Sequence, residues 1–334
     1  KLSAAIVEAI ILEHSTEEFL RKISDPFWFQ AFGCVLGFDW HSSGLTTTVC
    51  GALKLALKDL NVGIVACGGK GKTSLKTPQE ILNSDLGLST KKLERLSYAS
   101  RISAKVDNAC LQDGFQLYHH CFLFDEKGNW AVIQKGMNDS LHKARRYHWL
   151  SFEIEDFVDE PHKAVCCDVR LNNVLNMTSK ESKEVREISV EVAFELEKML
   201  KSIKAEKYLK MPMHHELYEF HLSNHGKKVL EKIRSIEPKD YEELIAIKGV
   251  GPKTVRALAL ISEIIYGKPP SYKDPAVYSF AHGGKDGWPF PVNKKIYDES
   301  ILTLKEAIEQ AKLGKREKLR MIRTLTQNIF HKKT

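Results

Sequence analysis

The order of apolar and polar residues divides the chain into a mixed first part and a helical second part. Apolar residues spaced three or four apart indicate helices, and strict alternation indicates strands. This rule predicts helices over residues 2–23, 45–60, 78–82, 90–106 and 143–157, and strands over residues 61–67, 118–124 and 130–135. The polar residues 125–129, which include a glycine, separate the last two strands and predict a β-hairpin.

From Ser179 onward the chain is highly charged and keeps helical spacing. Helices are predicted over residues 180–202, 227–233 and 297–314, with a linker around residues 211–215. Residues 161–177 are irregular, so we expect a domain boundary near Asn176. The predicted fold class is therefore α+β, with a mixed α/β domain at residues 1–176 and an all-helical domain at residues 177–334.

Residues 240–267 predict two helices joined by a tight turn. Asp240, with a glutamate three positions later, fits a capping box at the start of the first helix. Gly249 and Gly251 bracket one valine, which suits a turn that needs positive φ or a close backbone approach. Pro252 suits the first position of the second helix, where its missing N–H costs nothing.

The start of such a second helix has a chemical use. Its first backbone N–H groups point outward without partners, at the positive end of the helix dipole, and a phosphate oxygen fits there. Contacts of this kind hold a nucleic-acid backbone without reading its sequence. We therefore expect DNA contacts from Gly249, Gly251, Lys253 and Thr254. The alternative is an ordinary corner between two helices.

Residues 244–254 resemble the helix-hairpin-helix of DNA repair and recombination proteins, and the resemblance extends to the helix-hairpin-helix DNA glycosylases. Glycosylases with lyase activity carry a nucleophilic lysine at the position of Lys253 and an aspartate after the next helix, where this chain has Asp274. The spacing between the two is a few residues longer than is usual, and Pro275 and Ala276 replace the polar residues that commonly follow the aspartate. The resemblance implies base removal and lyase chemistry without a cofactor. Alternatively, Lys253 binds a phosphate and Asp274 begins a turn.

Over nearly its whole length the chain is also similar to an uncharacterised archaeal and bacterial family, a domain of unknown function that carries this hairpin. The similar stretches are residues 37–44, 105–108, 118–120, 145–149 and 279–287. This similarity brings no established activity.

Further basic residues are candidates for DNA contact. Lys70 and Lys72 lie in a Gly/Lys loop that lacks the first glycine of a P-loop, because position 66 is alanine, so a nucleotide triphosphatase is excluded. The loop either grips a phosphate or is a solvated surface loop. The other candidates are Arg145 and Arg146, which lie among aromatic residues, and His282 and Lys285, which lie in a glycine-rich stretch. The aromatic residues either stack on bases or belong to the core, and the glycine-rich stretch is either a second DNA clamp or an exposed turn.

A second enzyme hypothesis is a nuclease in the first domain that uses divalent metal, Mg or Mn. Carboxylates with histidines are what such phosphodiesterases use. The candidate ligands are Asp39, His41, Asp107, Asp113, His119 and His120. Because neighbouring residues of a strand point to opposite faces, only one of the two adjacent histidines can point into a given site. The alternative is that these are ordinary hydrogen-bonding residues.

Composition and charge narrow these possibilities only in part. The chain has 43% hydrophobic and 28% charged residues and a formal charge of +7, the sign that nucleic acid favours. Seven cysteines without a Cys-x-x-Cys pair favour neither a disulfide framework nor a zinc or iron–sulfur site.

With no long apolar run and no secretory signal, we expect a cytoplasmic protein that binds DNA and no membrane. The chain begins inside an amphipathic pattern, which predicts a preceding segment. A glycosylase with lyase activity, a metal-dependent nuclease and a non-enzymatic nucleic-acid-binding protein remain the three hypotheses.

Overall fold

The computed structural model describes residues 1–38, 44–196, 224–277 and 294–330. At its centre lies a five-stranded sheet in which every neighbouring pair of strands is antiparallel. In spatial order its strands are β1 (Ile64–Lys70), β3 (Gln116–Asp125), β4 (Trp130–Asn138), β5 (Lys143–Leu150) and β6 (Ala164–Cys166). The predicted hairpin is confirmed as β3 and β4, and the fold is a mixed α+β fold.

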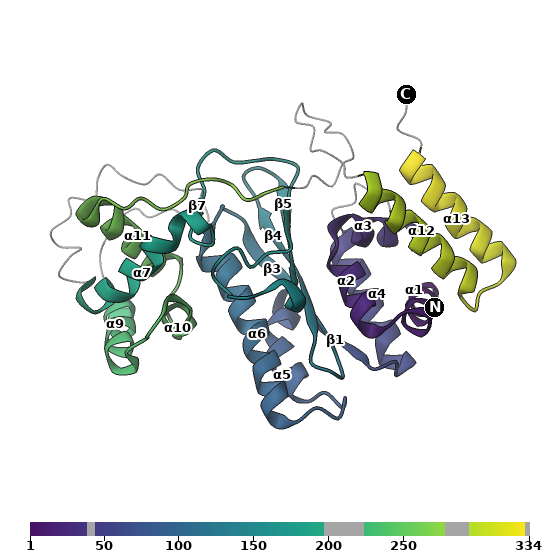
Figure 1. Ribbon diagram of the computed structural model, residues 1–334, viewed down its shortest axis with the longest axis horizontal. Coiled ribbons are helices and arrows are strands. Elements are labelled where there is room, and N and C mark those ends of the chain that lie inside the picture. The colour runs from purple at the N-terminus through teal and green to yellow at the C-terminus, as the bar shows by residue number, and fades with distance from the viewer. Residues whose placement is uncertain (39–43, 197–223, 278–293, 331–334) are drawn as a thin grey trace.

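Helices cover both faces of this sheet (Figure 1). Along β3, Cys121 and Leu123 face one hydrophobic core, and Phe122 and Phe124 face the other, because successive side chains point to opposite faces. The helices of the first core are α1 (Leu2–Glu13), α2 (Thr16–Ser24), α3 (Pro26–Val35) and α4 (Leu45–Leu60). The second core contains α5 (Thr77–Leu82) and α6 (Thr90–Ala109).

Two helices from the end of the chain complete the first core. They are α12 (Lys294–Gln310) and α13 (Lys315–Phe330), and they pack against α1 and α3. Leu304, Ile308 and Met321 are buried in the same cluster as the N-terminal helices. A division of the chain at residue 176 would assign both helices to a separate C-terminal domain, whereas their apolar faces are buried against the beginning of the chain.

The other helices of the described residues lie on the α6 side of the sheet (Figure 1). They are α7 (Lys183–Val192), α9 (Asn224–Ile236), α10 (Tyr241–Ala246) and α11 (Pro252–Tyr266). A small sheet of β2 (Leu111–Gln112) and β7 (Leu175–Asn176) lies beside them, and the short 3-10 helices are η1 (Gly71–Lys76), η2 (Ser151–Glu153), η3 (Lys180–Ser182) and η4 (Ala193–Glu195).

Three predicted helices differ from the structure in type or extent. The helix predicted over residues 180–202 is found as η3, α7 and η4, and residues 197–202 and the linker predicted around residues 211–215 lie outside the described residues. The helix predicted over residues 143–157 is strand β5 followed by η2. Both faces of β5 are buried and carry charged or polar residues, so the strand shows no clean alternation of hydrophobicity. The helix predicted over residues 2–23 is broken into α1 and α2, because Ser15 starts α2 by accepting a hydrogen bond from the N–H of Glu18 at 3.0 Å.

Within the described ranges, no helix is both long enough and apolar enough to cross a membrane.

Candidate functional site

The turn between α10 and α11 is built from local signals in its sequence. The Asp240 carboxylate accepts a hydrogen bond from the N–H of Glu243 at 2.8 Å, which confirms the predicted cap of α10. Gly249 has a φ of 108°, a conformation that side chains other than glycine rarely adopt. Gly251 is the N-cap of α11, and Pro252 is its first residue, as the sequence predicts.

The inner side of this turn is fixed to the rest of the molecule. Lys105 on α6 donates from Nζ to the carbonyl of Ile247 at 3.3 Å. Gln112 on β2 donates from Nε2 to the carbonyl of Pro252 at 2.8 Å and accepts two hydrogen bonds from Arg256 at 2.9 and 2.6 Å. Burial lowers the pKa of Lys105 and lowers that of Arg256 to about 10. These contacts hold the turn in one position before any ligand arrives.

The outer side of the turn presents positive charge and backbone donors. Lys248 and Lys253 are exposed, whereas Val250 between them is buried. No side chain in the described part of the chain caps the N-terminus of α11, so its first N–H groups face outward. A side chain at Gly251 would meet only the carbonyl oxygen of Gly249, at 3.9 Å, so the approach to these groups is open. An anion is the ligand that such an arrangement favours.

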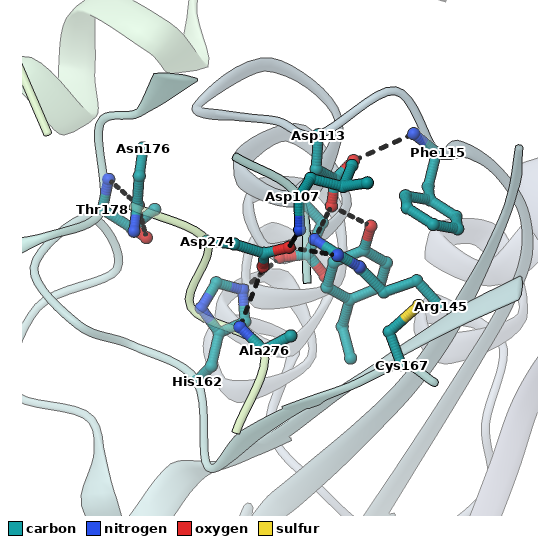
Figure 2. Close-up of polar contacts among 12 residues, drawn as sticks. Asp107, Asp113, Phe115, Arg145, His162, Cys167, Asn176, Thr178, Asp274 and Ala276 are labelled. Atoms are coloured by element: carbon teal, nitrogen blue, oxygen red, sulfur yellow. Dashed lines mark hydrogen bonds and ion pairs between the residues drawn. The ribbon is translucent and has the colours of Figure 1, made fainter. Parts of the chain in front are cut away.

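Asp274 lies in a buried ion pair (Figure 2). Its carboxylate is 2% exposed and pairs with Nη2 of Arg145 at 2.6 Å. It also accepts hydrogen bonds from the N–H of Leu171 at 2.8 Å and of Ala276 at 2.9 Å. Both oxygens of Asp274 are therefore engaged, and a catalytic role beside Lys253 would require Asp274 to leave Arg145.

Arg145 joins two carboxylates from distant parts of the chain. It pairs with Asp113 through Nη1 at 3.0 Å and with Asp274 through Nη2, and its side chain is fully buried. Asp113 also accepts a hydrogen bond from the Tyr147 hydroxyl at 2.7 Å. Burial alone would lower the pKa of Arg145, but Asp113 and Asp274 raise it well above its ordinary value. The expectation that Arg145 contacts DNA is therefore wrong, because its charge is buried and paired with two carboxylates.

Arg146 points to the opposite face of β5 and is also buried. It donates to the Gln30 amide oxygen at 2.9 Å, to the carbonyl of Pro26 at 3.1 Å and to Nε2 of His148 at 2.7 Å. Its guanidinium lies 4.5 Å from the ring centroid of Phe29. The expectation that Arg146 contacts DNA at the surface is also wrong, because these partners hold its side chain against α3.

Asp107 is the centre of a separate buried network. Its Oδ2 accepts hydrogen bonds from the Gln134 amide at 2.5 Å and from the Trp149 indole at 3.1 Å, and its Oδ1 contacts Nε2 of His162 at 2.5 Å. Burial raises the pKa of Asp107, although His162 and Trp149 act in the opposite direction.

The same network runs from Asp107 on α6 through Gln134 on β4 and His120 on β3, and returns to α6 at Ser100. Nδ1 of His120 lies 2.9 Å from the Gln134 amide oxygen, and its Nε2 lies 2.8 Å from the Ser100 hydroxyl. Burial lowers the pKa of His120 to about 4. The chain of contacts from Ser100 to Asp107 therefore fixes the imidazole in the core.

The proposed metal ligands do not gather at one point. In the ranges that the structure describes, no three or more histidine, cysteine, aspartate or glutamate side chains form a group that could hold a metal ion. Asp107 and Asp113 belong to different networks, with His162 and with Arg145 respectively. Asp39 and His41 lie outside the described residues.

His119 occupies an unusual environment. Its side chain is 2% exposed, and neither ring nitrogen has a hydrogen-bond partner among the described residues. In the sheet it lies between Lys70 on β1 and Lys135 on β4. Burial, Lys135 and Lys70 together lower the pKa of His119 to about 4, and burial and nearby cations lower that of Lys135 to about 8. The imidazole is therefore held neutral beside two lysines.

Of the remaining candidates for DNA contact, two lie in the described part of the chain and two lie outside it. Lys70 ends β1 and Lys72 lies in η1, and both are exposed, so both are available to a ligand. His282 and Lys285 lie outside the described residues.

Sequence reasoning missed Arg256 and His162. Arg256 stands among the buried residues Val255, Leu258 and Ala259 of α11, and a cation on an apolar helix face is a signal for a buried partner. His162 lies in an irregular stretch, and its contact with Asp107 spans 55 residues, so no local pattern could have indicated it.

Comparison with known proteins identifies a family without an assigned activity. No curated protein and no solved structure matches the chain. A family model described as "Protein of unknown function (DUF763)" matches residues 1–292, a range that includes the sheet and the turn between α10 and α11. The chain therefore belongs to the DUF763 family.

Proposed function

We propose that this protein binds DNA through the turn between α10 and α11, as a helix-hairpin-helix, and acts in DNA repair or processing. One observation carries the proposal: the uncapped N-terminus of α11 faces outward between the exposed Lys248 and Lys253. A phosphate would accept hydrogen bonds from the backbone N–H groups, and the two lysines would add charge.

The rigidity of the turn strengthens this proposal. Gln112 and Lys105 hold its carbonyl groups from behind, so the N–H groups need no rearrangement when a phosphate binds. Such a contact positions the backbone and reads no bases. The expected binding is therefore independent of sequence and strongly dependent on salt.

The finer hypothesis is glycosylase and lyase chemistry by Lys253 and Asp274. Lys253 is exposed beside the proposed phosphate, where a lysine could reach a sugar. Asp274, however, would have to exchange its buried partner Arg145 for a substrate. Phosphate binding by Lys253 needs only its charge and no such exchange.

The binding proposal is tested by Gly251→Val. The φ of Gly251 is −146°, which valine readily adopts, and the added Cβ would meet only the Gly249 carbonyl oxygen, at 3.9 Å. The methyl groups would then cover the N–H groups of α11. We expect at least about a tenfold loss of affinity for every duplex sequence, because losing one charge-assisted contact costs about 1.5–3 kcal/mol.

The matched control is Gly51→Val on α4, where an added Cβ meets nothing within 4 Å. Binding is measured by fluorescence anisotropy on two duplexes of unrelated sequence, and folding by circular dichroism. Unchanged affinity in folded Gly251→Val would remove the turn as a DNA site.

A further inference from the structure

A cavity of about 750 Å³ lies between the start of α6 and the loop that joins β3 to β4. Its volume falls within the range of small-molecule and cofactor sites, roughly 300–1,000 Å³. Tyr98, Trp130 and Phe157 supply its aromatic lining. The cavity therefore has the size and the surface needed for a flat aromatic ligand.

The aromatic lining is held in a fixed arrangement. The rings of Trp130 and Phe157 are stacked, with centroids 5.9 Å apart and planes 4° from parallel. The edge of Tyr98 meets Phe157 at 6.1 Å and 90°. Trp130 is also stacked against Phe122, with ring centroids 5.4 Å apart. This packing prepares the wall before binding, which lowers the entropy cost of ordering a ligand against it.

The rim of the cavity is strongly basic. Lys91, Lys92, Arg95 and Lys127 line it and are exposed, and Glu94 is the one acidic residue among its described lining residues. Nζ of Lys92 donates to the carbonyl of Lys127 at 3.4 Å, which links α6 to the β3–β4 loop across the rim. Such a rim complements phosphates next to a flat ring.

The cavity is connected to the proposed DNA-binding turn. The Tyr98 hydroxyl donates to Oε1 of Glu242 on α10 at 2.6 Å, and Lys105 on the same helix as Tyr98 donates to the carbonyl of Ile247 in the turn. Tyr98 and Lys105 are seven residues apart, so they lie on the same side of α6, about 10 Å from each other along its axis. A nucleic-acid strand held at the turn could follow α6 to the cavity.

We propose that this cavity binds an unstacked base of a single-stranded DNA segment, with the adjoining phosphates on the basic rim. The inference rests on the proposed function only in naming DNA as the ligand. The base lies against the apolar wall formed by Tyr98, Trp130 and Phe157, a contact that does not depend on which base is present. The protein thereby holds backbone at the turn and an exposed base at the cavity.

The test is photocrosslinking of the full chain to a single-stranded oligonucleotide that carries 5-iododeoxyuridine, with adducts mapped by mass spectrometry. We expect adducts at Tyr98, Trp130 or Phe157. The double variant Lys91→Ala/Lys127→Ala should reduce crosslinking and single-strand affinity at least about fivefold, and Lys58→Ala, an exposed lysine of α4, should change neither. Adducts that map elsewhere would overturn the proposal.

One further measurement tests the class of ligand, and a second separates this inference from the proposed function. Poly-glutamate should compete poorly with the oligonucleotide, and equal competition at equal charge would show an acidic-peptide site and overturn a base site. Duplex binding that depends on Gly251, without any crosslink in the cavity, would refute the cavity and leave the turn intact. If Gly251→Val leaves duplex binding unchanged and crosslinks still form in the cavity, the turn is refuted as a DNA site and the cavity is supported.

Discussion

Arg145 and Asp274 form a buried ion pair of 2.6 Å although 129 residues separate them in the chain. The pair joins strand β5 to the segment that follows α11 (Figure 2). Asp113 pairs with the same guanidinium, so three distant segments converge on one cation. Asp274 thereby fixes the end of the α10–α11 region to the central sheet.

Asp274→Asn should strongly destabilise the protein. Arg145 would keep its pair with Asp113 but lose one of its two buried carboxylate partners, and losing a hydrogen bond to a charged group typically costs about 1.5–3 kcal/mol. Lys273→Ala is the matched control, because the neighbouring lysine pairs with Glu181 at the surface, where its side chain is 79% exposed. Urea unfolding measures both variants. A loss below about 1 kcal/mol for Asp274→Asn would show that the ion pair does not hold the segment.

The two roles of Lys253 predict different behaviour for Lys253→Arg. As a phosphate ligand the residue supplies charge, so Lys253→Arg should keep most of the DNA affinity and Lys253→Gln should lose part of it. As a nucleophile it forms a Schiff base, so both variants should lose the adduct that borohydride traps on DNA containing damaged bases. We expect the phosphate pattern, because Asp274 is engaged with Arg145. A trapped adduct that depends on Lys253 would establish the lyase hypothesis instead.

His119 and His120 should make the fold sensitive to mild acid. Burial is the main cause that lowers both pKa values from 6.5 to about 4. Between these values the unfolded chain binds more protons than the folded one, so stability is complete above pH 6.5 and is lost as pH falls toward 4. A shift of this size corresponds to at most about 3 kcal/mol per histidine. Melting temperature measured from pH 7.5 to 4.5 checks the prediction.

His119→Leu isolates one of these contributions. It removes a titrating group and two ring nitrogens that lack partners among the described residues, and unsatisfied buried polar groups cost about 1–3 kcal/mol each. The variant should therefore be at least as stable as the wild type at pH 7 and lose less stability in acid. His14→Gln, at an exposed histidine, is the control. A steeper acid loss in His119→Leu would contradict protonation of the buried imidazole as a cause of the acid sensitivity.

Local features of the fold were predictable from the sequence, whereas features made by distant partners were not. The turn at Gly249 and Pro252 depends on caps and glycine conformation within a few residues, and its predicted geometry is confirmed. The sequence predicts a helix at strand β5, because its arginines are buried against partners more than 30 residues away, which no local pattern indicates. The same distance explains why Arg145 and Arg146 looked like surface DNA ligands.

The packing of the last helices shows a second limit. Helical spacing predicts α12 as an amphipathic helix, and its buried Leu304 and Ile308 confirm an apolar face. Nothing in that spacing says that the face covers α1 and α3, since apolar faces are interchangeable in sequence. Asp107 and Asp113 illustrate the same limit for the site, because six positions of separation say nothing about their different partners, His162 and Arg145.

The most direct test of DNA binding by the α10–α11 turn is the salt dependence of duplex affinity in the wild type, Lys253→Gln and Lys248→Gln. Each phosphate contact that a lysine neutralises adds about 0.9 to the slope of log K against log salt. We predict the same wild-type slope on two unrelated sequences, reduced by about one in each variant. If both variants keep the wild-type slope and the wild-type affinity, the α10–α11 turn does not bind DNA.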